Sequence, residues 1–394
     1  MSRFRLLPTT AQQAVLLEHC RHARFVWNLA VEQQQYWRPG RRAPGYNEQS
    51  AQLTEIRAEY SWLAAGSQKV QQQALRDFAQ AMRNFLNGSH GRPSWRKAGV
   101  HEGFRQVGLE PRQVEKLNRR YGQVWVSKVG WVRFRCSRPV PPGVKSYRIT
   151  RDRAGRWHAA FAHIPDPIPA PCDGSVVGVD RGVAVSAALS TGELLHAPSL
   201  TPGERLRLHR QQRRLARAKP GSNRRQRTKL AIAKLKAREA DRRRDWVEKS
   251  TTDLARRFDT IRVEKLDVRA MTRSARGTFD QPGVRVAQKR GLNRAIRRQS
   301  WGQLVARLSQ KASGRVERVP AAYTSQRCSA CGHIAPGNRK SQAVFSCIAC
   351  KAGPCNADVN AARNIAAGRA VPAQGDLAVG RSANCEPQLS SPAA

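Results

Sequence analysis

The sequence predicts a multidomain protein of the α+β class. Its 394 residues exceed the usual size of one domain, so two or more hydrophobic cores are expected. Apolar residues recur at helical spacing in the first 89 residues, whereas short alternating segments with Gly turns dominate residues 90–164. From residue 174 onward, apolar strands alternate with long charged helices.

The first segments are expected to be one strand and two long helices. Residues 1–5 fit a short strand, and Thr9 and Thr10 are suitable N-caps for a helix that reaches Trp37. A second helix is expected over Gln68–Asn87, where apolar residues repeat at helical spacing and an Asn-Gly pair favours a stop. These apolar stripes predict core packing.

A small β module and a linker follow. Segments such as QVWVSKVGWVRFRC alternate around Gly-containing turns, as antiparallel hairpins do. Residues 165–174 carry four prolines and a glycine, which is typical of a linker between domains.

The second half is expected to begin with two strands and to continue with a basic helical hairpin. SVVGVDRGVAVSAALSTGELLHA fits a strand, a turn and a second strand, and residues 204–249 fit two helices with a turn at 219–223. Residues 201–250 hold 18 basic and 5 acidic side chains, which favours a nucleic-acid contact over a solvated face. Residues 370–394 are rich in Pro, Ala, Ser and Gly and are expected to be disordered.

The charge of the chain points to a polyanionic partner. Lys and Arg number 71 against 28 Asp and Glu, a formal net charge of +43 that a nucleic acid would neutralise. A membrane role is disfavoured, because neither a signal peptide nor a run of about 20 apolar residues is visible. We therefore expect a cytoplasmic protein, in which thiols stay reduced and clustered cysteines indicate metal.

Three acidic residues occupy positions that favour chemistry. A buried-looking strand, VVGVD, ends in Asp180, and the strand in DTIRVEKLDV brings Glu264 to its end. Asp358 lies where Asn356 is a suitable N-cap for a helix that ends at Gly368. One such acid alone is usually structural, but converging carboxylates are what two magnesium ions need for phosphodiester hydrolysis. Asp180, Glu264 and Asp358 are therefore the predicted catalytic residues and magnesium ligands.

Asp267 lies close to Glu264 but is not assigned to the site. On a strand that continued past Glu264, its odd separation would direct it to the opposite face. We therefore expect it in a supporting or surface position.

Four cysteines form the most specific local pattern in the chain. Cys328-Ser-Ala-Cys331 and Cys347-Ile-Ala-Cys350 are two C-x-x-C knuckles separated by 15 residues, a spacing typical of a four-thiolate zinc ribbon. All four positions are cysteine, so no open position is left for catalysis and the single zinc ion is expected to be structural. Cys355 lies near enough for ligand exchange to be considered.

Three tryptophans can be considered for stacking on nucleobases: Trp27, Trp37 and Trp95. Core packing is the favoured interpretation for them.

Together, these motifs resemble TnpB, the OrfB-type protein family of bacterial insertion sequences, which is related to the type V CRISPR effectors. The resemblance spans almost the whole chain. It is carried by RFVWNLA, by GVDRGV around Asp180, by VEKLDV around Glu264, by YTSQRCSACG and FSCIAC, and by NADVNAARNI around Asp358. Lys351, where the family commonly has Gly, and Cys355 are departures that concern only the ribbon.

The resemblance implies a magnesium-dependent, RNA-guided DNA endonuclease of a transposable element. A guide RNA from the element end would pair with double-stranded target DNA beside a short flanking motif, and the three acids would occupy the catalytic positions of a RuvC centre. It also implies a monomer with its RNA in the bacterial cytosol, with no membrane partner.

The resemblance further implies an N-terminal β-barrel wedge interrupted by a helical recognition lobe, followed by an RNase H-like RuvC domain (α/β) with an inserted zinc ribbon. The expected boundaries are 1–8 and 90–170 for the wedge, 9–89 for the helical lobe, 174–318 and 356–369 for the RuvC domain, and 319–355 for the ribbon.

Three alternatives remain open from the sequence. A transposase that transfers strands uses related chemistry, but such enzymes usually order their acids Asp, Asp, Glu rather than Asp, Glu, Asp. A nuclease-inactive RNA-guided repressor would lack one of the acids, and none is missing. A type V CRISPR effector differs in the source of its guide, which the protein sequence does not encode.

Overall fold

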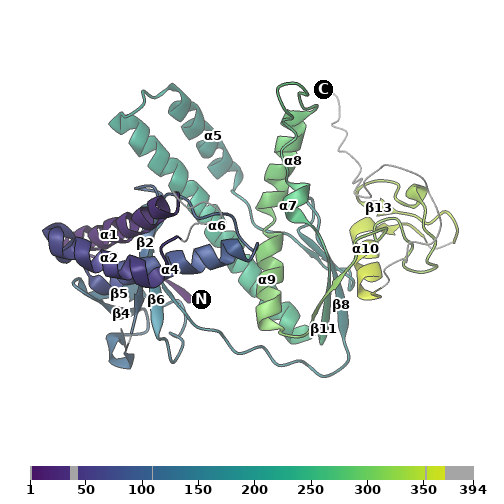
Figure 1. The fold of residues 1–394 in the computed structure, drawn as a ribbon. Coiled ribbons are helices and arrows are strands. Elements are labelled where there is room, and N and C mark those ends of the chain that lie inside the picture. Colours follow the sequence, from purple (N-terminus) through teal and green to yellow (C-terminus); the bar gives the residue numbers. More distant parts are fainter. Residues whose placement is uncertain (1, 36–42, 109, 351–352, 369–394) are drawn as a thin grey trace. The chain divides into compact units, whose positions relative to one another are not determined.

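A computed structural model describes residues 2–35, 43–108, 110–350 and 353–368 (Figure 1). The chain divides into two compact units, one within residues 1–164 and 204–237 and the other within 165–203 and 238–394. Trp37 lies outside the described residues. The tail at 370–394, for which we expected disorder, also lies outside them. Helices and sheets are both present in quantity, in agreement with the predicted α+β class.

The first unit contains a seven-stranded antiparallel sheet with the order β2-β6-β7-β1-β5-β4-β3. The N-terminal strand lies inside it, because Phe4 pairs with Ala159 of β7 and Leu6 pairs with Phe134 of β5. Phe4, Phe134 and Phe161 are buried against one another, so the first residues of the chain complete the core of the β module. The strands are β1 (Ser2–Leu6), β2 (Glu102–Val107), β3 (Val114–Lys116), β4 (Tyr121–Val126), β5 (Gly130–Arg135), β6 (Ser146–Arg151) and β7 (Trp157–Phe161).

Helices in the first 89 residues accompany this sheet. They are α1 (Thr10–Gln35), α2 (Tyr46–Glu59), α3 (Ser61–Ala64) and α4 (Gln68–Leu86). The expected start of α1 is confirmed, since the Thr9 hydroxyl accepts a hydrogen bond from the backbone N–H of Gln12 at 3.2 Å. The expected end of α4 at Asn87 is confirmed to within one residue. Helix α2 was not predicted, because it buries only Gln49 and Leu53 and its apolar face is too narrow to give a periodic signal.

The basic hairpin is confirmed as two helices, α5 (Pro202–Arg217) and α6 (Asn223–Arg257), drawn in teal in Figure 1. Arg225 joins them, because its Nη1 donates to the carbonyl oxygens of Leu215 at 2.9 Å and Ala218 at 2.8 Å. Leu215 lies in the last turn of α5 and Ala218 directly follows the helix, so the guanidinium lies at the C-terminal end, where a cation is favourable. Helix α6 continues eight residues beyond the expected end at residue 249.

The second unit contains a five-stranded mixed sheet with the order β10-β9-β8-β11-β12. Strands β8, β11 and β12 are parallel neighbours, and β9 and β10 form an antiparallel extension next to β8. The strands are β8 (Val176–Asp180), β9 (Ala187–Leu189), β10 (Leu194–Leu195), β11 (Thr260–Glu264) and β12 (Val316–Val319). The expected strands that end in Asp180 and Glu264 are both confirmed.

Further helices of this unit are α7 (Val268–Met271), α8 (Val286–Arg298), α9 (Trp301–Lys311) and α10 (Ala357–Ala366). Helix α7 begins where we expected a strand to continue through Asp267. The strand does not continue past Glu264. Instead, Asp267 is the N-cap of α7, and its Oδ1 accepts from the backbone N–H of Ala270 at 2.9 Å. Asp267 is exposed, so its place at the surface agrees with our expectation although the reason for it was wrong.

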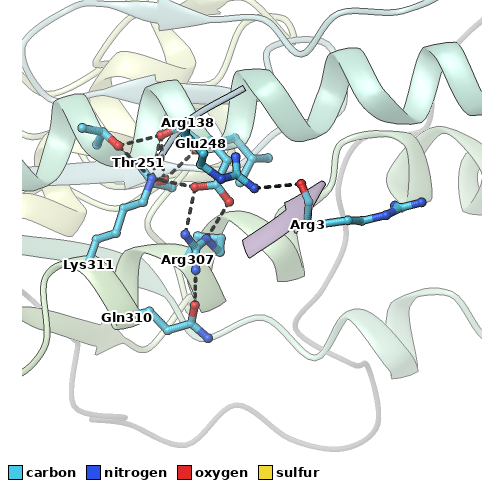
Figure 2. Close-up of polar contacts among 9 residues, drawn as sticks. Arg3, Arg138, Glu248, Thr251, Arg307, Gln310 and Lys311 are labelled. Atoms are coloured by element: carbon cyan, nitrogen blue, oxygen red, sulfur yellow. Dashed lines mark hydrogen bonds and ion pairs between the residues drawn. The ribbon is translucent and has the colours of Figure 1, made fainter. Parts of the chain in front are cut away.

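An ion-pair network joins α6 to α9 in the second unit (Figure 2). Lys311 is nearly buried, and its Nζ lies 2.9 Å from Glu248 Oε2 and donates to the Thr251 hydroxyl at 2.9 Å. Arg307 approaches the other carboxylate oxygen of Glu248 at 2.7 Å. Several oxygen partners offset the cost of burying the Lys311 cation. The network therefore holds α6 and α9 together.

The expected linker at residues 165–174 lies along the second unit. The backbone N–H of Ile168 donates to Lys311 O at 2.7 Å, and its carbonyl accepts from Arg315 Nη2 at 2.7 Å. Farther along, the backbone N–H of Cys172 donates to Asp259 Oδ1 at 2.8 Å.

Among the residues that the structure describes, no helix is both long and apolar enough to cross a membrane.

Candidate active site

Two parallel strands bring Asp180 and Glu264 to one edge of the second sheet. Strand β8 ends at Asp180 and strand β11 ends at Glu264. Val179 pairs with Val263, so the acids that follow them are neighbours at the carboxyl ends of the two strands. The valines are fully buried, and this burial fixes where the strands end.

Helix α10 carries Asp358 in its first turn. The Asn356 side chain caps the helix by accepting from the backbone N–H groups of Asp358 at 3.0 Å and Val359 at 3.1 Å, as expected from the sequence. The helix crosses β8 so closely that a Cβ on Gly178 would overlap the carbonyl oxygen of Ala362. The third acid therefore begins a helix that lies directly against the strand ending in Asp180.

The three carboxylates influence one another electrostatically. Burial raises the pKa of Asp180 well above its usual range, and the negative charges of Glu264 and Asp358 raise it further. Burial also raises the pKa of Asp358. The structure thus brings the three predicted acids into one cluster. Among the described residues, the side chains that form a group with all metal-ligand atoms within 4.8 Å of one another are four cysteines, and the three acids do not form such a group.

Two arginines that the sequence analysis missed lie at this cluster. Arg339 Nη2 donates to Asp358 Oδ1 at 3.3 Å, and its positive charge lowers the pKa of Asp358 against the effect of burial. Arg181 is nearly buried and donates to the backbone carbonyl of Glu264. Arg181 directly follows Asp180, which is a usable signal, whereas nothing in the local sequence marks Arg339.

A hydroxyl group also contacts the cluster. Thr324 Oγ1 donates to Glu264 Oε1 at 2.8 Å, and only 4% of Thr324 and 8% of Glu264 are exposed. Thr324 belongs to the YTSQRCSACG segment but was not among the predicted site residues.

The four predicted cysteines meet in the second unit, close to α10. Cys328 Sγ lies 3.8 Å from Cys350 Sγ, and Cys331 Sγ lies 3.6 Å from Cys347 Sγ. Four thiolates at the Zn–S distance of about 2.3 Å form a tetrahedron with edges of about 3.8 Å. The quartet therefore has the dimensions of a four-thiolate zinc site, as expected.

Cys355 is a fifth thiol at the edge of this group. It lies on β14 (Cys355–Asn356), which pairs with β13 (Val344–Phe345), and it packs against the quartet's small core. Its sulfur is not one of the four that converge. Burial raises the pKa of this thiol, which disfavours the thiolate that a metal ligand requires.

Family profiles match three segments of the chain. Residues 160–275, which contain Asp180 and Glu264, match a family described as "Probable transposase" of the OrfB type. Residues 301–365, which contain the cysteine quartet and Asp358, match the "Cas12f1-like, TNB domain". Residues 2–42 match an OrfB-type "Helix-turn-helix domain".

A full-length relative decides the family. The chain is 36% identical to "Putative RNA-guided DNA endonuclease InsQ" of Escherichia coli (strain K12), over 95% of this chain and 94% of the relative. The chain belongs to the TnpB (OrfB-type) family. A second member, "Putative RNA-guided DNA endonuclease" of Streptomyces pristinaespiralis, is 31% identical over 95% of this chain and 90% of its own length.

The fold of this TnpB-family chain also has a counterpart among solved structures. It is similar to a protein chain in a structure entitled "Cryo-EM structure of the Cas12f1-sgRNA-target DNA complex", with a TM-score of 0.52 and 13% identity. The similarity covers 90% of this chain and 82% of the other. At that level of identity the likeness concerns the fold alone.

Helix α5 presents a basic surface in this TnpB-family chain. Exposed arginines recur along the whole helix. The one acidic residue of the helix, Glu204, is buried. These arginines are Arg205, Arg207, Arg210, Arg213, Arg214 and Arg217. Across the turn, exposed Arg224, Arg227 and Lys229 begin α6. We call this set the α5–α6 basic surface.

The candidate tryptophans differ in their surroundings. Trp27 is buried as expected, with its Nε1 donating to Ser94 O at 2.9 Å and the Arg96 guanidinium 3.6 Å from the centre of its ring. The expected core position of Trp95 is wrong, because 42% of this residue is exposed. It lies in a hollow of about 390 Å³ that Phe25 also lines.

Proposed function

We propose that this TnpB-family chain is an RNA-guided DNA endonuclease of a transposable element that hydrolyses a phosphodiester bond with two Mg²⁺ ions held by Asp180, Glu264 and Asp358. The observation that carries the proposal is the position of the three acids, because Asp180 and Glu264 end two paired parallel strands and Asp358 lies in the first turn of the helix packed against one of them. The charges of Glu264 and Asp358 raise the pKa of Asp180, which agrees with this proximity. A cluster of like charges that is largely removed from water is unfavourable on its own and is stabilised by divalent cations. Glu264 is buried, and Asp180 and Asp358 are partly buried. Family membership supports the same activity, because relatives that match nearly the whole chain carry that name.

The chemistry of these residues supports magnesium as the ion. Carboxylate oxygens are the ligands that Mg²⁺ prefers, and here three of them come from two strand ends and one helix start. Asp180, Glu264 and Asp358 would hold the ions, which would supply activation of the attacking water and stabilisation of the leaving oxygen. The strand ends and α10 anchor the backbones that carry the carboxylates.

The two arginines complement this charge. Arg339 lies 3.3 Å from Asp358 and is well placed to exchange that carboxylate for a phosphate oxygen when nucleic acid enters. Arg181 is held between the ends of β8 and β11 through the Glu264 carbonyl, and its charge offsets part of the repulsion between the acids. We propose a phosphate contact for Arg339 and a supporting role for Arg181.

We propose that the quartet Cys328, Cys331, Cys347 and Cys350 binds one structural Zn²⁺. Sulfur separations of 3.6 and 3.8 Å support tetrahedral coordination. A complete four-thiolate shell leaves no position for substrate, so the ion would stabilise the fold and take no part in cleavage.

We propose the domain organisation that the family resemblance implies. The sheet of β8 to β12 together with α10 would be the RNase H-like RuvC domain (174–318 and 356–369), with the zinc ribbon (319–355) inserted before α10. The position of β1 inside the sheet of β2 to β7 supports a wedge domain made of residues 1–8 and 90–170. The helices of residues 9–89 would form the recognition lobe.

We propose a guide RNA and double-stranded target DNA as partners of a monomeric protein in the bacterial cytosol. The net charge of +43 and the α5–α6 basic surface suit the phosphate backbones of a guide–target duplex. Base pairing between guide and target would then supply sequence choice, which explains how a largely basic surface serves a specific nuclease.

One experiment tests this function. RNA that copurifies with the expressed protein is sequenced, and the complex is offered a library of DNA targets with randomised flanks in Mg²⁺. Cleavage at sites that match the copurified RNA and share one flanking motif is expected. Strand joining instead of cleavage would favour a transposase, and binding without cleavage would favour a nuclease-inactive repressor. The Asp180→Ala protein serves as the control and should bind without cutting.

A further inference from the structure

Thr324 links the Glu264 carboxylate to the cysteine-bearing part of the chain. Its hydroxyl lies 2.8 Å from Glu264 Oε1, and its backbone belongs to the segment that leads into the first knuckle at Cys328. The hydroxyl also lies 3.1 Å from the Ala321 carbonyl, which is the longer of its two contacts. Thr324 is therefore positioned to hold one oxygen of Glu264 in a fixed direction.

Two buried asparagines of α10 hold this segment from the other side. Asn364 Nδ2 donates to the Thr324 carbonyl at 3.0 Å and to the Arg327 carbonyl at 2.7 Å. Asn360 bonds the residues on both sides of Cys328. Its Nδ2 donates to Arg327 O at 2.8 Å, and its Oδ1 accepts from the N–H of Ser329 at 3.0 Å. The two asparagines are four residues apart and lie on one face of the helix.

Burial makes these contacts difficult to replace with water. Asn360 is 1% exposed and Asn364 is 2% exposed. A buried amide that loses its partner keeps its desolvation penalty, so each of these bonds favours one arrangement of the segment. The same helix carries Asp358 in its first turn, two residues before Asn360. Segment 324–329 and α10 are thus connected by hydrogen bonds. The segment contains Cys328 and contacts Glu264 through Thr324, and α10 carries Asp358.

We propose that Thr324 is a positioning residue for Glu264, and that Asn360 and Asn364 couple its position to the zinc knuckle at Cys328. The inference rests on the proposed function, since it concerns how the carboxylates are prepared for divalent ions. Partners that orient a metal ligand commonly contribute a factor of about 10 to 100 in metal affinity or activity. The ribbon would then contribute to the nuclease site through a hydroxyl, besides stabilising the fold.

The first test removes only the hydroxyl. Thr324→Val and Thr324→Ser are compared in the purified protein with its copurified RNA, with Thr272→Val as the matched control. The Thr272 hydroxyl donates to the Val268 carbonyl at 2.9 Å. Mn²⁺ binding is measured by electron paramagnetic resonance, together with the Mg²⁺ concentration for half-maximal cleavage and the zinc content.

For Thr324→Val we expect Mn²⁺ affinity to fall and the required Mg²⁺ concentration to rise by about tenfold or more, with zinc content unchanged. Thr324→Ser keeps the hydroxyl and should behave like the unsubstituted protein, as should Thr272→Val. If Thr324 had a purely structural role, Thr324→Val would lower the melting temperature. The protein that remained folded would still need the normal Mg²⁺ concentration for half-maximal cleavage. If Thr324→Val cannot be purified folded, Thr324→Ala is measured in its place.

The second test addresses the coupling. Cys331→Ser is combined with Thr324→Val. If loss of zinc weakens Mn²⁺ binding by displacing Thr324, it should have little further effect once the Thr324 hydroxyl has been removed. We expect Cys331→Ser to weaken Mn²⁺ binding in the unsubstituted background and to have a much smaller effect in the Thr324→Val background. Fully additive effects would overturn the coupling.

Failure of this inference is distinguishable from failure of the proposed function. If Asp180→Ala abolishes cleavage but Thr324→Val and Thr324→Ala retain normal Mn²⁺ and Mg²⁺ dependence, the positioning role is refuted and the nuclease assignment stands. If Asp180→Ala cuts as well as the unsubstituted protein, the proposed function itself fails.

Discussion

Gly178 and Ala362 are in such close contact that the strand has no room for a side chain at that point. Gly178 lies two residues before Asp180 on β8, and a Cβ there would overlap backbone atoms of Ala362 and Ala366 on α10. The distance between the third acid and the first two therefore depends on a glycine. This requirement is steric, since the left-handed backbone region that favours glycine is not involved at this residue.

Gly178→Ala should displace α10 and separate Asp358 from Asp180. Overpacking of this kind costs about 1–3 kcal/mol in the free energy of unfolding. We expect cleavage to fall much more than RNA binding, because the α5–α6 basic surface is not altered. Cleavage rate and RNA affinity are measured on the same preparation. Gly302→Ala is a suitable control, because a Cβ on that helical glycine of α9 meets no atom within 4 Å. Equal cleavage by the two variants would contradict the proposed role of the contact.

Much of the candidate site follows from the sequence, because its signals are local. Apolar strands that end in Asp180 and Glu264, the Asn356 cap and the two C-x-x-C knuckles each depend on a few neighbouring residues. What brings them together is not local. The parallel pairing of β8 with β11 joins segments about 80 residues apart, and no periodicity within either segment specifies its partner.

The residues that the sequence analysis missed depend on tertiary contacts. Arg339 reaches Asp358 from the segment between the two C-x-x-C knuckles, and Thr324 reaches Glu264 from a turn. An arginine or a threonine in a polar loop is ordinary by composition, so only the folded arrangement distinguishes it. Asp267 is the opposite case, since a strand was expected to continue where the chain begins a short helix instead.

The stability of the metal-free protein should depend on pH through Asp180. Its pKa in the folded state is raised above the ordinary value of 3.8, so the fold favours the protonated form. That contribution is fully present below the ordinary pKa and is lost as the pH rises through the raised pKa. We therefore expect the melting temperature to fall as the pH rises above about 4 without divalent ions, and Mg²⁺ to restore it.

Asp180→Asn provides the comparison for this measurement. The amide does not titrate, so its melting temperature should change less over the same pH range and should respond less to Mg²⁺. Identical pH profiles for the two proteins would show that Asp180 does not carry the predicted linkage.

Removal of one knuckle cysteine should remove the zinc. Cys328→Ser is expected to lower the zinc content well below one ion per chain and to destabilise the second unit, because structural zinc contributes directly to folding. The zinc content is measured by atomic absorption and the stability by thermal unfolding. Cys355→Ser is the matched control and should retain full zinc, since its sulfur lies outside the quartet. Full zinc in Cys328→Ser, or its loss in Cys355→Ser, would require a different ligand set.

The α5–α6 basic surface should contribute to nucleic-acid affinity in a salt-dependent way. Arg207, Arg210 and Arg214 lie near one face of α5 and are exposed. Each change to Gln should reduce the slope of log affinity against log salt by about 1 if the arginine contacts a phosphate. Arg112→Gln, which removes an exposed arginine paired with Glu110, is the control. An unchanged slope in the triple variant would assign this surface to another role.

We propose that Asp180, Glu264 and Asp358 together hold the ions that cut DNA. The most direct test of this proposal is the rate of Mg²⁺-dependent cleavage by the guide-loaded protein when each acid is changed to Ala separately. Each change should lower the rate by about 1,000-fold or more while target binding stays within a small factor of normal. Cleavage at a normal rate by any one of the three variants would contradict the account.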